Sequence, residues 1–461
     1  MTQPSFKQRA AAGLADERVR RAVKLATLHK AAARQAGMSL LRNPDELREL
    51  AARIKRHTLQ RLPDYLELFA ARVEHNGGRV HFAADAAAAC RVVCDIARAA
   101  GSKLAVKAKS MVSEEIHLNA ALQAAGVRVV ETDLGEFIVQ IDNDRPSHIV
   151  TPIIHKDRKR VAVAMQRETG CAYTEDPRQL SEIARVYLRD VFRRCDLGIT
   201  GVNFGVAETG SLCVCTNEGN GRMTMTRPRV HIALMGIEKL VPRLTDLAVF
   251  LKLLARSSTG QPLTTYTTLI TGPRRPGEPD GPEHLHVVIL DNGRSPLLGG
   301  EFESVLCCIR CGACLNACPV YRNIGGHAYG GVYPGPIGAL VTPLLSAPER
   351  HAELPRASSL CGACAVACPV RIDIPELLVK LRRDTLAAGP LHKRLAMRVW
   401  RWLMLSERRY ARAQRLLTRL VRRGGDGWII GGAGPLAAWL SQRDLPPLPR
   451  QSFRDWWRVQ R

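Results

Sequence analysis

Cysteines recur at a spacing that can hold an iron–sulfur cluster. The segment from Cys308 to Pro319 reads C-x2-C-x2-C-x3-C-P. This is the spacing of bacterial ferredoxins, in which three closely spaced thiolates hold one [4Fe–4S] cluster and the fourth binds the other cluster. Three cysteines so close together cannot share one helical face, so we expect the segment to wrap as a loop. Gly312 and Ala313 are small enough to let backbone N–H groups approach the cluster.

A second, incomplete copy of the motif ends at Cys368-Pro369, and Ser358 takes the position of its first cysteine. Two copies predict two [4Fe–4S] clusters. The ligands that we expect are Cys308, Cys311, Cys314 and Cys368 for the first cluster, and Cys318, Cys361 and Cys364 for the second.

The fourth ligand of the second cluster stays open at this point. It could be Ser358, Cys307 or an external ligand, or the corner could be empty, which would leave a labile iron or a [3Fe–4S] cluster. Cys307 fits neither spacing and ranks as a spare thiol. Zinc and disulfides are the competing interpretations, but zinc sites favour two separated C-x2-C pairs and need neither the third cysteine nor the proline.

Composition narrows the class of protein. The chain has 461 residues and 50.7 kDa, and its 46% hydrophobic and 24% charged residues are those of a globular protein rather than a disordered one. No run approaches the roughly 18 apolar residues of a membrane span, and the first residues lack the apolar stretch of a secretory signal. We therefore expect a cytoplasmic protein. The remaining thiols are predicted to be buried small hydrophobes: Cys90, Cys94, Cys171, Cys195, Cys213 and Cys215.

Four segments follow from the local patterns: a helical region at 1–75, an α/β domain at 76–300, a cysteine module at 301–375 and a basic helical region at 376–461. In the α/β domain, short apolar strands alternate with helices, which predicts a mostly parallel sheet with helices on both faces. We expect strands at 79–84, 104–109, 127–131, 149–154, 197–202, 211–215, 230–237, 265–270 and 285–290, and helices at 85–100, 113–125, 177–194 and 245–257.

A ligand of such a sheet would bind at the carboxyl ends of its strands. No G-x-G-x-x-G or P-loop sequence is present, so nothing favours a nicotinamide, flavin or ATP site of those types. The glycine-rich stretches near Glu208, Gly210 and Arg222 give a possible anion or substrate crevice, although glycines in tight turns explain them equally well. Further polar residues expected near the strand ends are Lys107, Lys109, Glu131, Asp133 and Glu136.

The C-terminal region is strongly basic. Residues 376–461 contain 19 Lys and Arg against six acidic residues, over half of the formal charge of +24. This region could dock an acidic partner or, through its tryptophans, an anionic membrane surface. Binding to nucleic acid is a weaker hypothesis, because no nucleic-acid-binding motif accompanies the charge.

Several of these segments resemble one known family. Lys109-Ser-Met-Val-Ser-Glu-Glu, Glu131-Thr-Asp-Leu-Gly-Glu, Gly205-Val-Ala-Glu-Thr-Gly and the run from Cys308 through Pro336 are similar to those of the lactate utilization protein B family. The resemblance implies a cytoplasmic iron–sulfur protein that carries electrons during the oxidation of L-lactate to pyruvate. It also implies an isomerase/CoA-transferase-like α/β domain and two partners, one with cysteine-rich repeats and one with a similar α/β domain.

The chemistry favours relay over substrate oxidation by this chain. Oxidation of lactate removes two electrons, whereas a [4Fe–4S] cluster moves one electron at a time, and no hydride-acceptor fingerprint is present. The hypothesis is that this chain carries electrons while a partner or an assembled interface holds the substrate. The alternatives are relay in another 2-hydroxy-acid or glycerol-phosphate oxidising complex and, from another class, a cluster-containing regulator that binds nucleic acid.

Overall fold

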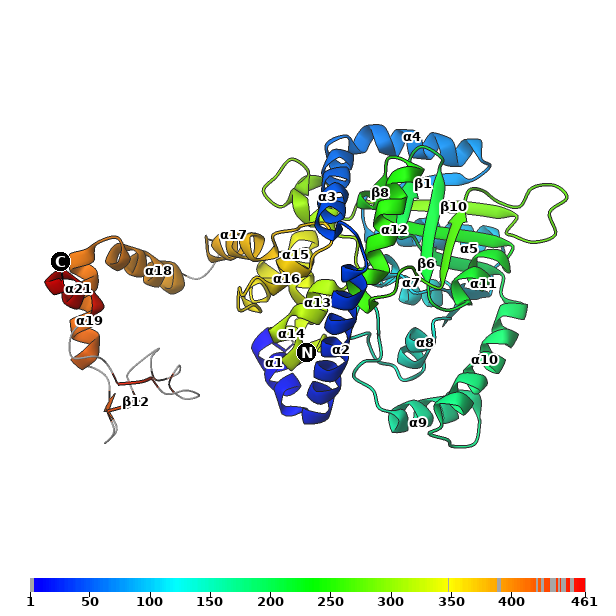
Figure 1. Cartoon of the computed structure of the whole chain (residues 1–461). Helices are drawn as coiled ribbons and strands as arrows, with labels where there is room; N and C mark the ends of the chain where they lie inside the picture. Colours follow the sequence, from blue (N-terminus) through cyan, green and yellow to red (C-terminus); the bar gives the residue numbers. More distant parts are fainter. Residues whose placement is uncertain are drawn as a thin grey trace. The chain divides into compact units, whose positions relative to one another are not determined.

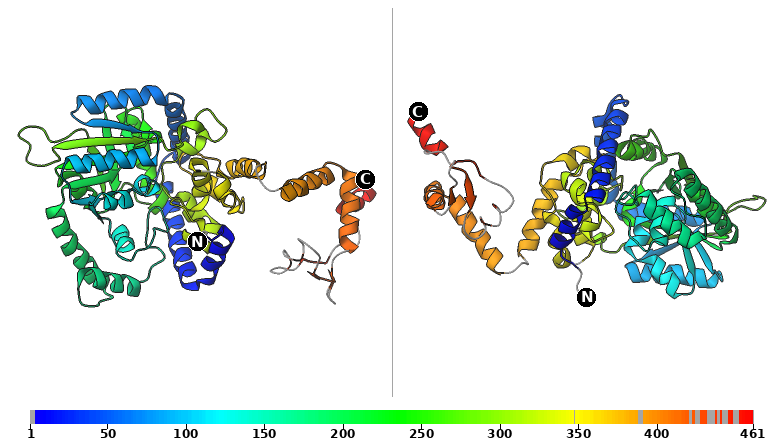
Figure 2. Two further views of the ribbon diagram at one scale, coloured as in Figure 1. Left: turned by 180° about the vertical axis from the view of Figure 1, so that it is seen from behind. Right: turned by 90° about the horizontal axis from the view of Figure 1, so that it is seen from below.

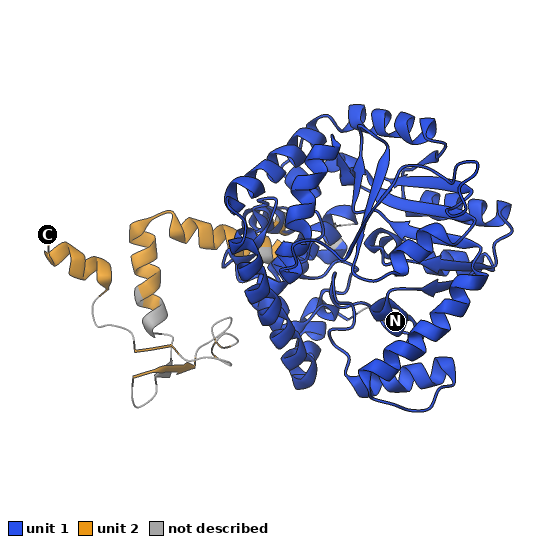
Figure 3. Ribbon diagram, turned by 45° about the vertical axis from the view of Figure 1, so that its right-hand side comes forward, with its two compact units in different colours: residues 1–385 blue, residues 386–461 orange. Residues whose placement is uncertain are grey.

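The computed structural model describes residues 4–346, 348–387, 391–419, 422–423, 427–431, 437, 440, 445–447 and 452–460. It divides into two compact units, residues 1–385 and 386–461 (Figure 3). The larger unit contains the α/β domain and all of the cysteines. Part of the predicted basic region lies outside the described residues, including Arg443, Pro449 and Arg450.

A parallel sheet of six strands forms the centre of the α/β domain (Figure 1). Its order is β1-β10-β7-β4-β2-β3, and every neighbouring pair is parallel. The predicted fold class is therefore confirmed. The strands are β1 (Arg79–Ala83), β2 (Leu104–Lys107), β3 (Arg128–Glu131), β4 (Leu197–Gly201), β7 (Val230–Gly236) and β10 (His284–Leu290).

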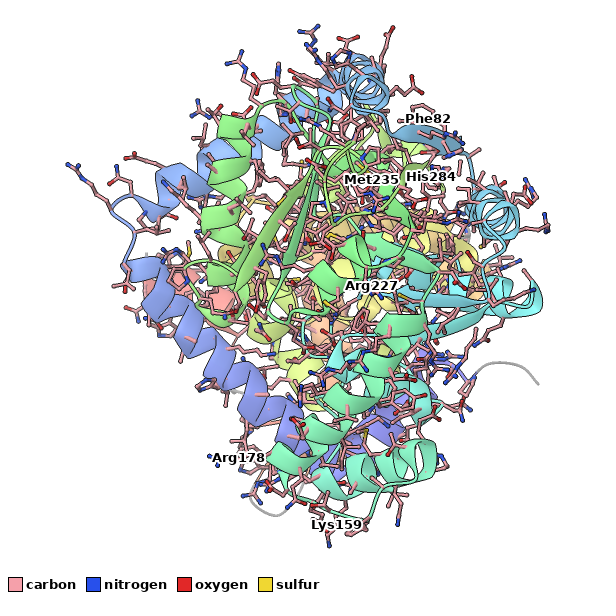
Figure 4. All side chains as sticks on the ribbon, turned by 90° about the vertical axis from the view of Figure 1, so that its right-hand side faces the viewer. Phe82, Lys159, Arg178, Arg227, Met235 and His284 are labelled. Carbon is pink, nitrogen blue, oxygen red and sulfur yellow. The ribbon has the colours of Figure 1, made fainter. Side chains whose placement is uncertain are left out.

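Both faces of this sheet are covered, which explains why its strands are apolar throughout. Successive side chains of a strand point to opposite faces: in β2, Ala105 packs into one core cluster and Val106 into another. On the Ala105 side lie α5 (Ala86–Ala99), α6 (Met111–Glu115) and α7 (Leu118–Ala124). On the Val106 side lie α8 (Leu134–Ile141), α9 (Arg158–Thr169) and α10 (Pro177–Arg194), where Lys159 and Arg178 point to solvent (Figure 4).

Two of the expected strands belong to a second sheet rather than to the parallel one. Its order is β8-β5-β6-β9, with β6 antiparallel to both of its neighbours. Gly210, with a φ of +69°, makes the tight turn that folds β6 back on β5. The strands are β5 (Phe204–Val206), β6 (Ser211–Thr216), β8 (Leu240–Val241) and β9 (Tyr266–Ile270), with α11 (Asn220–Thr226) following β6 and α12 (Leu244–Thr259) following β8.

The strand expected at 149–154 is wrong, because this segment is irregular. Its backbone N–H groups are bound locally: those of Val150 and Thr151 donate to Nδ1 of His148. The helix expected at 113–125 is divided into α6 and α7, since His117 has a φ of +54°. Local side-chain and backbone geometry thus overrides the apolar pattern at both places.

The N-terminal helices join the cysteine module to the α/β domain. The second of them, α2, packs against α12 and also against α13 and α14 of the module (Figures 1 and 2). One hydrophobic core contains Phe250 of α12 together with Cys311 and Tyr321 of the module. The four helices are α1 (Phe6–Ala15), α2 (Glu17–Ser39), α3 (Pro44–Gln60) and α4 (Leu62–His75).

The cysteine module consists of short helices. They are η3 (Glu303–Cys307), α13 (Ala313–Ala317), α14 (Pro319–Ile324), η4 (His327–Tyr329), α15 (Gly335–Leu345), η5 (Pro348–His351), η6 (Leu354–Arg356), α16 (Ala363–Ala367) and α17 (Ile374–Ala387). The smaller unit contains α18 (Leu391–Met404), α19 (Glu407–Arg419), the short strands β11 (Arg422–Arg423) and β12 (Ile429–Gly431), and α21 (Phe453–Gln460). Among the described residues, no helix is both long enough and apolar enough to cross a membrane.

Candidate metal centre

The first cysteine motif wraps as a loop, as its spacing predicts. Arg310 and Gly312, on either side of Cys311, both have positive φ values, +59° and +80°. These turns bring the chain around before α13 begins at Ala313. A side chain at position 312 would contact Val150, since an added Cβ would lie 3.3 Å from its Cγ2. Gly312 therefore allows both the turn and the close packing.

Four cysteines line one pocket beside this loop. Cys308, Cys311 and Cys314 come from the first motif, and Cys368 comes from the second, more than fifty residues later in the chain. The remaining wall is mostly apolar, with Ile309, Ile337, Val370, Ile372 and Ile374. Four soft sulfur donors in an apolar pocket are what an iron–sulfur cluster requires.

The thiols of this pocket influence one another. Burial raises the pKa of Cys314, and the neighbouring Cys308, Cys311 and Cys368 raise it further. Burial also raises the pKa of Cys368, to about 11, although backbone N–H groups oppose the shift. Backbone amides point at the sulfurs: those of Arg310 and Ile372 donate to Cys308 and Cys368, each at 3.4 Å. Convergent thiols with amide donors fit a cluster whose iron would replace the thiol protons.

The other three motif cysteines form a second group. Burial, together with the neighbouring Cys318, raises the pKa of Cys364 to about 12. The thiol of Cys361 in turn adds to the raised pKa of Cys318. Helices α13 and α16, which carry the two motifs, are in contact. The last cysteine of each motif therefore lies with the thiols of the other motif, and Cys361 is exposed.

Basic side chains surround the first group of thiols. Burial lowers the pKa of Lys55, while the nearby Cys307 raises it. The Arg48 guanidinium donates to the carbonyl oxygen of Cys368 at 2.8 Å and to that of Val366 at 2.6 Å. Arg310 lies with its Cζ 4.5 Å from the centre of the Tyr333 ring. A bound cluster carries negative charge, so these cations would favour its reduced form.

A buried ion network joins this loop to the carboxyl edge of the parallel sheet. Arg294, which follows β10, donates from Nε to Glu238 Oε2 at 2.8 Å, and from Nη2 to Glu115 Oε2 at 2.8 Å. Glu238 follows β7, and Nη2 of Arg310 lies 3.8 Å from its Oε1. Burial raises the pKa of Glu238, but Arg294, Lys239 and Arg310 outweigh it and hold this pKa at about 2.

The crevice residues predicted from the sequence have structural partners. Lys107 pairs with Glu131 at 2.8 Å and with Glu114 at 3.0 Å. Lys109 lies 3.6 Å from Glu136, whose pKa burial raises to about 7 despite that lysine. Asp133 caps α8 by accepting hydrogen bonds from the backbone N–H groups of Gly135 and Glu136.

The three residues of the predicted anion crevice are not brought together. Glu208 accepts a hydrogen bond from the backbone N–H of Leu244 at 3.0 Å, at the start of α12. Gly210 makes the turn before β6, whereas Arg222 lies in α11 beyond its other end and stacks over Tyr266. A strand of this length separates its ends by about 17 to 20 Å.

Among the residues that the structure describes, one other group of ligand-type side chains lies away from the cysteines. Ligand atoms of Asp144, His155 and His327 fall within 4.8 Å of one another. However, Oδ2 of Asp144 is already paired, with Nζ of Lys156 at 2.6 Å and with Nε2 of His155 at 2.8 Å.

Comparison with known proteins agrees with the geometry. Residues 66–290 match the family model of the LUD domain, residues 304–372 that of a 4Fe-4S dicluster domain, and residues 380–461 that of the lactate utilisation protein B C-terminal domain. Lactate utilization protein B of Bacillus licheniformis is 45% identical over 99% of this chain and 97% of its own length. This chain belongs to the lactate utilization protein B family. The namesake of Shouchella clausii is also 45% identical, over 98% of this chain and 96% of its own length.

Membership in the family confirms the predicted resemblance, and the dicluster match confirms the prediction of two [4Fe–4S] clusters. A DUF162 family protein from Deinococcus radiodurans is a solved structure with 13% identity and a TM-score of 0.28, covering 50% of this chain and 98% of its own.

Sequence reasoning missed the residues that hold the centre in place. Lys55, Glu238, Arg294 and Tyr333 lie far apart in the sequence and meet only through the fold. Arg310 and Tyr333 carried a signal, because both lie inside the run from Cys308 through Pro336.

Proposed function

We propose that this chain relays electrons in a complex that oxidises L-lactate to pyruvate. The observation that carries the proposal is the pocket that Cys368 of the second motif shares with Cys308, Cys311 and Cys314 of the first. The pocket supports these four as ligands of the first cluster, and the neighbouring thiols of Cys318, Cys361 and Cys364 support the second set. Bound clusters would each accept and release one electron.

The difference in exposure between the two sets of thiols indicates where this chain exchanges electrons with a partner. The first set lies in an apolar pocket against the α/β domain, whereas Cys361 of the second set is exposed. Electron transfer between proteins requires close approach, so the second set is the natural point of exchange with a redox partner. The chain's own residues then hold the first set away from water, with Arg48 and Arg310 supplying positive charge.

The relatives' names place them in lactate utilization, which supports the same role here. The partners that we propose are a cysteine-rich-repeat protein and a second LUD-type protein, in a cytoplasmic complex. No nucleic acid is expected. The basic region at 376–461 would dock an acidic partner or a membrane surface; its described part exposes Trp400, Trp402, Arg398 and Arg401.

The division of labour can be tested on the purified protein. Prepared without oxygen, the chain alone should show the visible absorption of iron–sulfur clusters but should not oxidise L-lactate with an artificial electron acceptor. Lactate oxidation by the isolated chain would overturn the proposal. A deletion strain should fail to grow on L-lactate, while growth loss restricted to glycerol phosphate or another 2-hydroxy acid would assign the relay to a different substrate.

A further inference from the structure

The two cysteine motifs are structural copies offset by fifty residues. Cys311, Cys314 and Cys318 correspond to Cys361, Cys364 and Cys368, and each last cysteine is followed by a proline. The backbone repeats as well: Arg310 and Leu360 have φ values of +59° and +56°, and Gly312 and Gly362 have +80° and +82°. In this correspondence, Ser358 stands where the first copy has Cys308.

The side chains at these two positions make the same contact. The backbone N–H of Arg310 donates to Sγ of Cys308 at 3.4 Å, and the backbone N–H of Leu360 donates to Oγ of Ser358 at 3.1 Å. Both are bonds from residue i+2 to the side chain of residue i. The Ser358 oxygen is therefore oriented in its loop as the Cys308 sulfur is in its own.

Cys307, which fits neither motif spacing, is not a candidate for the fourth ligand of the second cluster. Burial raises the pKa of Cys307 to about 11, and the charged groups that modify this shift are Lys55, Arg56, Glu303 and Cys368. Cys307 is buried at the end of η3, which packs against α3, and it directly precedes Cys308 of the first set. The six scattered cysteines lie in the α/β domain, where Cys90 and Cys195 donate to backbone carbonyl oxygens and Cys213 lies 3.8 Å from Cys215.

The side chain of Arg382 binds the backbone of the turn at Ser358. Arg382 of α17 donates from Nη2 to the carbonyl oxygen of Ser358 at 3.1 Å and from Nε to that of Pro355 at 2.7 Å. These two bonds fix the backbone of the turn from which the Ser358 hydroxyl projects.

We propose that the Ser358 hydroxyl oxygen is the fourth protein ligand of the second cluster. On binding, the Ser358 O–H bond breaks and an Fe–O bond forms; the proton passes to solvent, and the water that held that position on iron leaves. No electron is transferred in this step. The inference rests on the proposed ligand sets for the two clusters.

The test uses the full-length protein purified anaerobically, with iron and sulfide analysis, EPR and Mössbauer spectroscopy. The wild type should hold two complete four-iron clusters. S358A should lose about one iron per chain and, after oxidation, show the EPR signal of a three-iron cluster. S181A, which changes an exposed serine of α10 in the α/β domain, should match the wild type.

S358C provides a readout if S358A does not fold. A thiolate in place of the serine oxygen should keep all of the iron, change the Mössbauer parameters of one iron and shift the reduction potential of the second cluster only. Full iron and unchanged spectra in both variants would show an external ligand and overturn the proposal, as would a three-iron cluster in the wild type. A wild-type protein with one cluster, or with zinc alone, would instead refute the proposed ligand sets.

Discussion

Arg310 of the cysteine loop lies 3.8 Å from Glu238 at the carboxyl end of β7, with Nη2 facing Oε1. This pair places the first cysteine group at the sheet edge where α/β folds usually bind their ligands. Arg294 completes the contact by binding Glu238 and Glu115 together. In this chain, buried ion pairs and the cysteine loop lie at this edge, beside the carboxyl ends of β7 and β10.

Replacing Glu238 by glutamine should destabilise the larger unit strongly. The E238Q variant keeps the side-chain volume but leaves Arg294 and Arg310 with less negative charge in a buried position. Loss of one partner from a buried ion pair costs about 3 kcal/mol or more, so the urea midpoint should fall clearly. The matched control is E182Q, whose exposed pair with Arg185 contributes little, and an equal effect of both changes would contradict the account.

Removing the last cysteine of each motif should abolish the cluster of the other motif. C368A should lose the first cluster and C318A the second, since each thiol lies with the opposite group. Each variant should retain about half of the iron, with a different EPR spectrum of the remaining cluster. C307A is the control and should keep both clusters. Loss of the same cluster from C318A and C368A would refute the crossed arrangement.

Removing the positive charge of Arg310 should lower the reduction potential of the first cluster. Its guanidinium lies near Cys308, and a nearby cation stabilises the added electron. An EPR-monitored redox titration of R310Q should therefore show a shift to lower potential for one cluster only, whereas R310K should lie closer to the wild type. An upward shift, or an equal shift of both clusters, would be inconsistent with the charge environment described.

Acid should destabilise the parallel sheet through His231. This side chain is fully buried and its Nε2 lies 2.9 Å from Thr200 Oγ1. Burial, with a contribution from His286, lowers its pKa to about 3 in the folded state. Because this folded pKa lies below the unfolded value of about 6.5, the contribution of His231 to stability is present above pH 6.5 and is lost as the pH falls towards 3.

By pH 6, the unfolded state gains about 0.8 kcal/mol from protonation of this one residue. The free energy of unfolding of the wild type should fall from pH 8 to pH 6, and H231Q should show a smaller fall. Identical slopes for the two proteins would mean that His231 is not held neutral.

The sequence predicted the cysteine ligands of the clusters better than it predicted the residues that surround them. Cys368 of the second motif lies with the thiols of the first motif, as the motif spacing predicts. The three residues before the last cysteine of each motif direct its thiol away from its own loop. The parallel sheet likewise follows from alternating strands and helices. These features depend on local patterns that a single segment contains.

The features that were missed depend on contacts between distant segments. The apolar runs at 211–215 and 265–270 do form strands, but nothing in their composition distinguishes the second sheet from the first. The segment at 149–154 has the apolar pattern of a strand, yet His148 binds its backbone N–H groups. The pairing of Glu238 with Arg294 joins the ends of two strands that are adjacent in the sheet but distant in the chain.

The central claim is that electrons from lactate reach the clusters of this chain through its partners. The most direct measurement is the low-temperature EPR spectrum of the oxidised protein after anaerobic mixing with its two proposed partners and L-lactate. The account predicts signals of reduced clusters that require lactate and both partners and that are absent from a sample with C368A and C318A combined. Clusters that stay oxidised in the complete mixture, while dithionite reduces them readily, would contradict it.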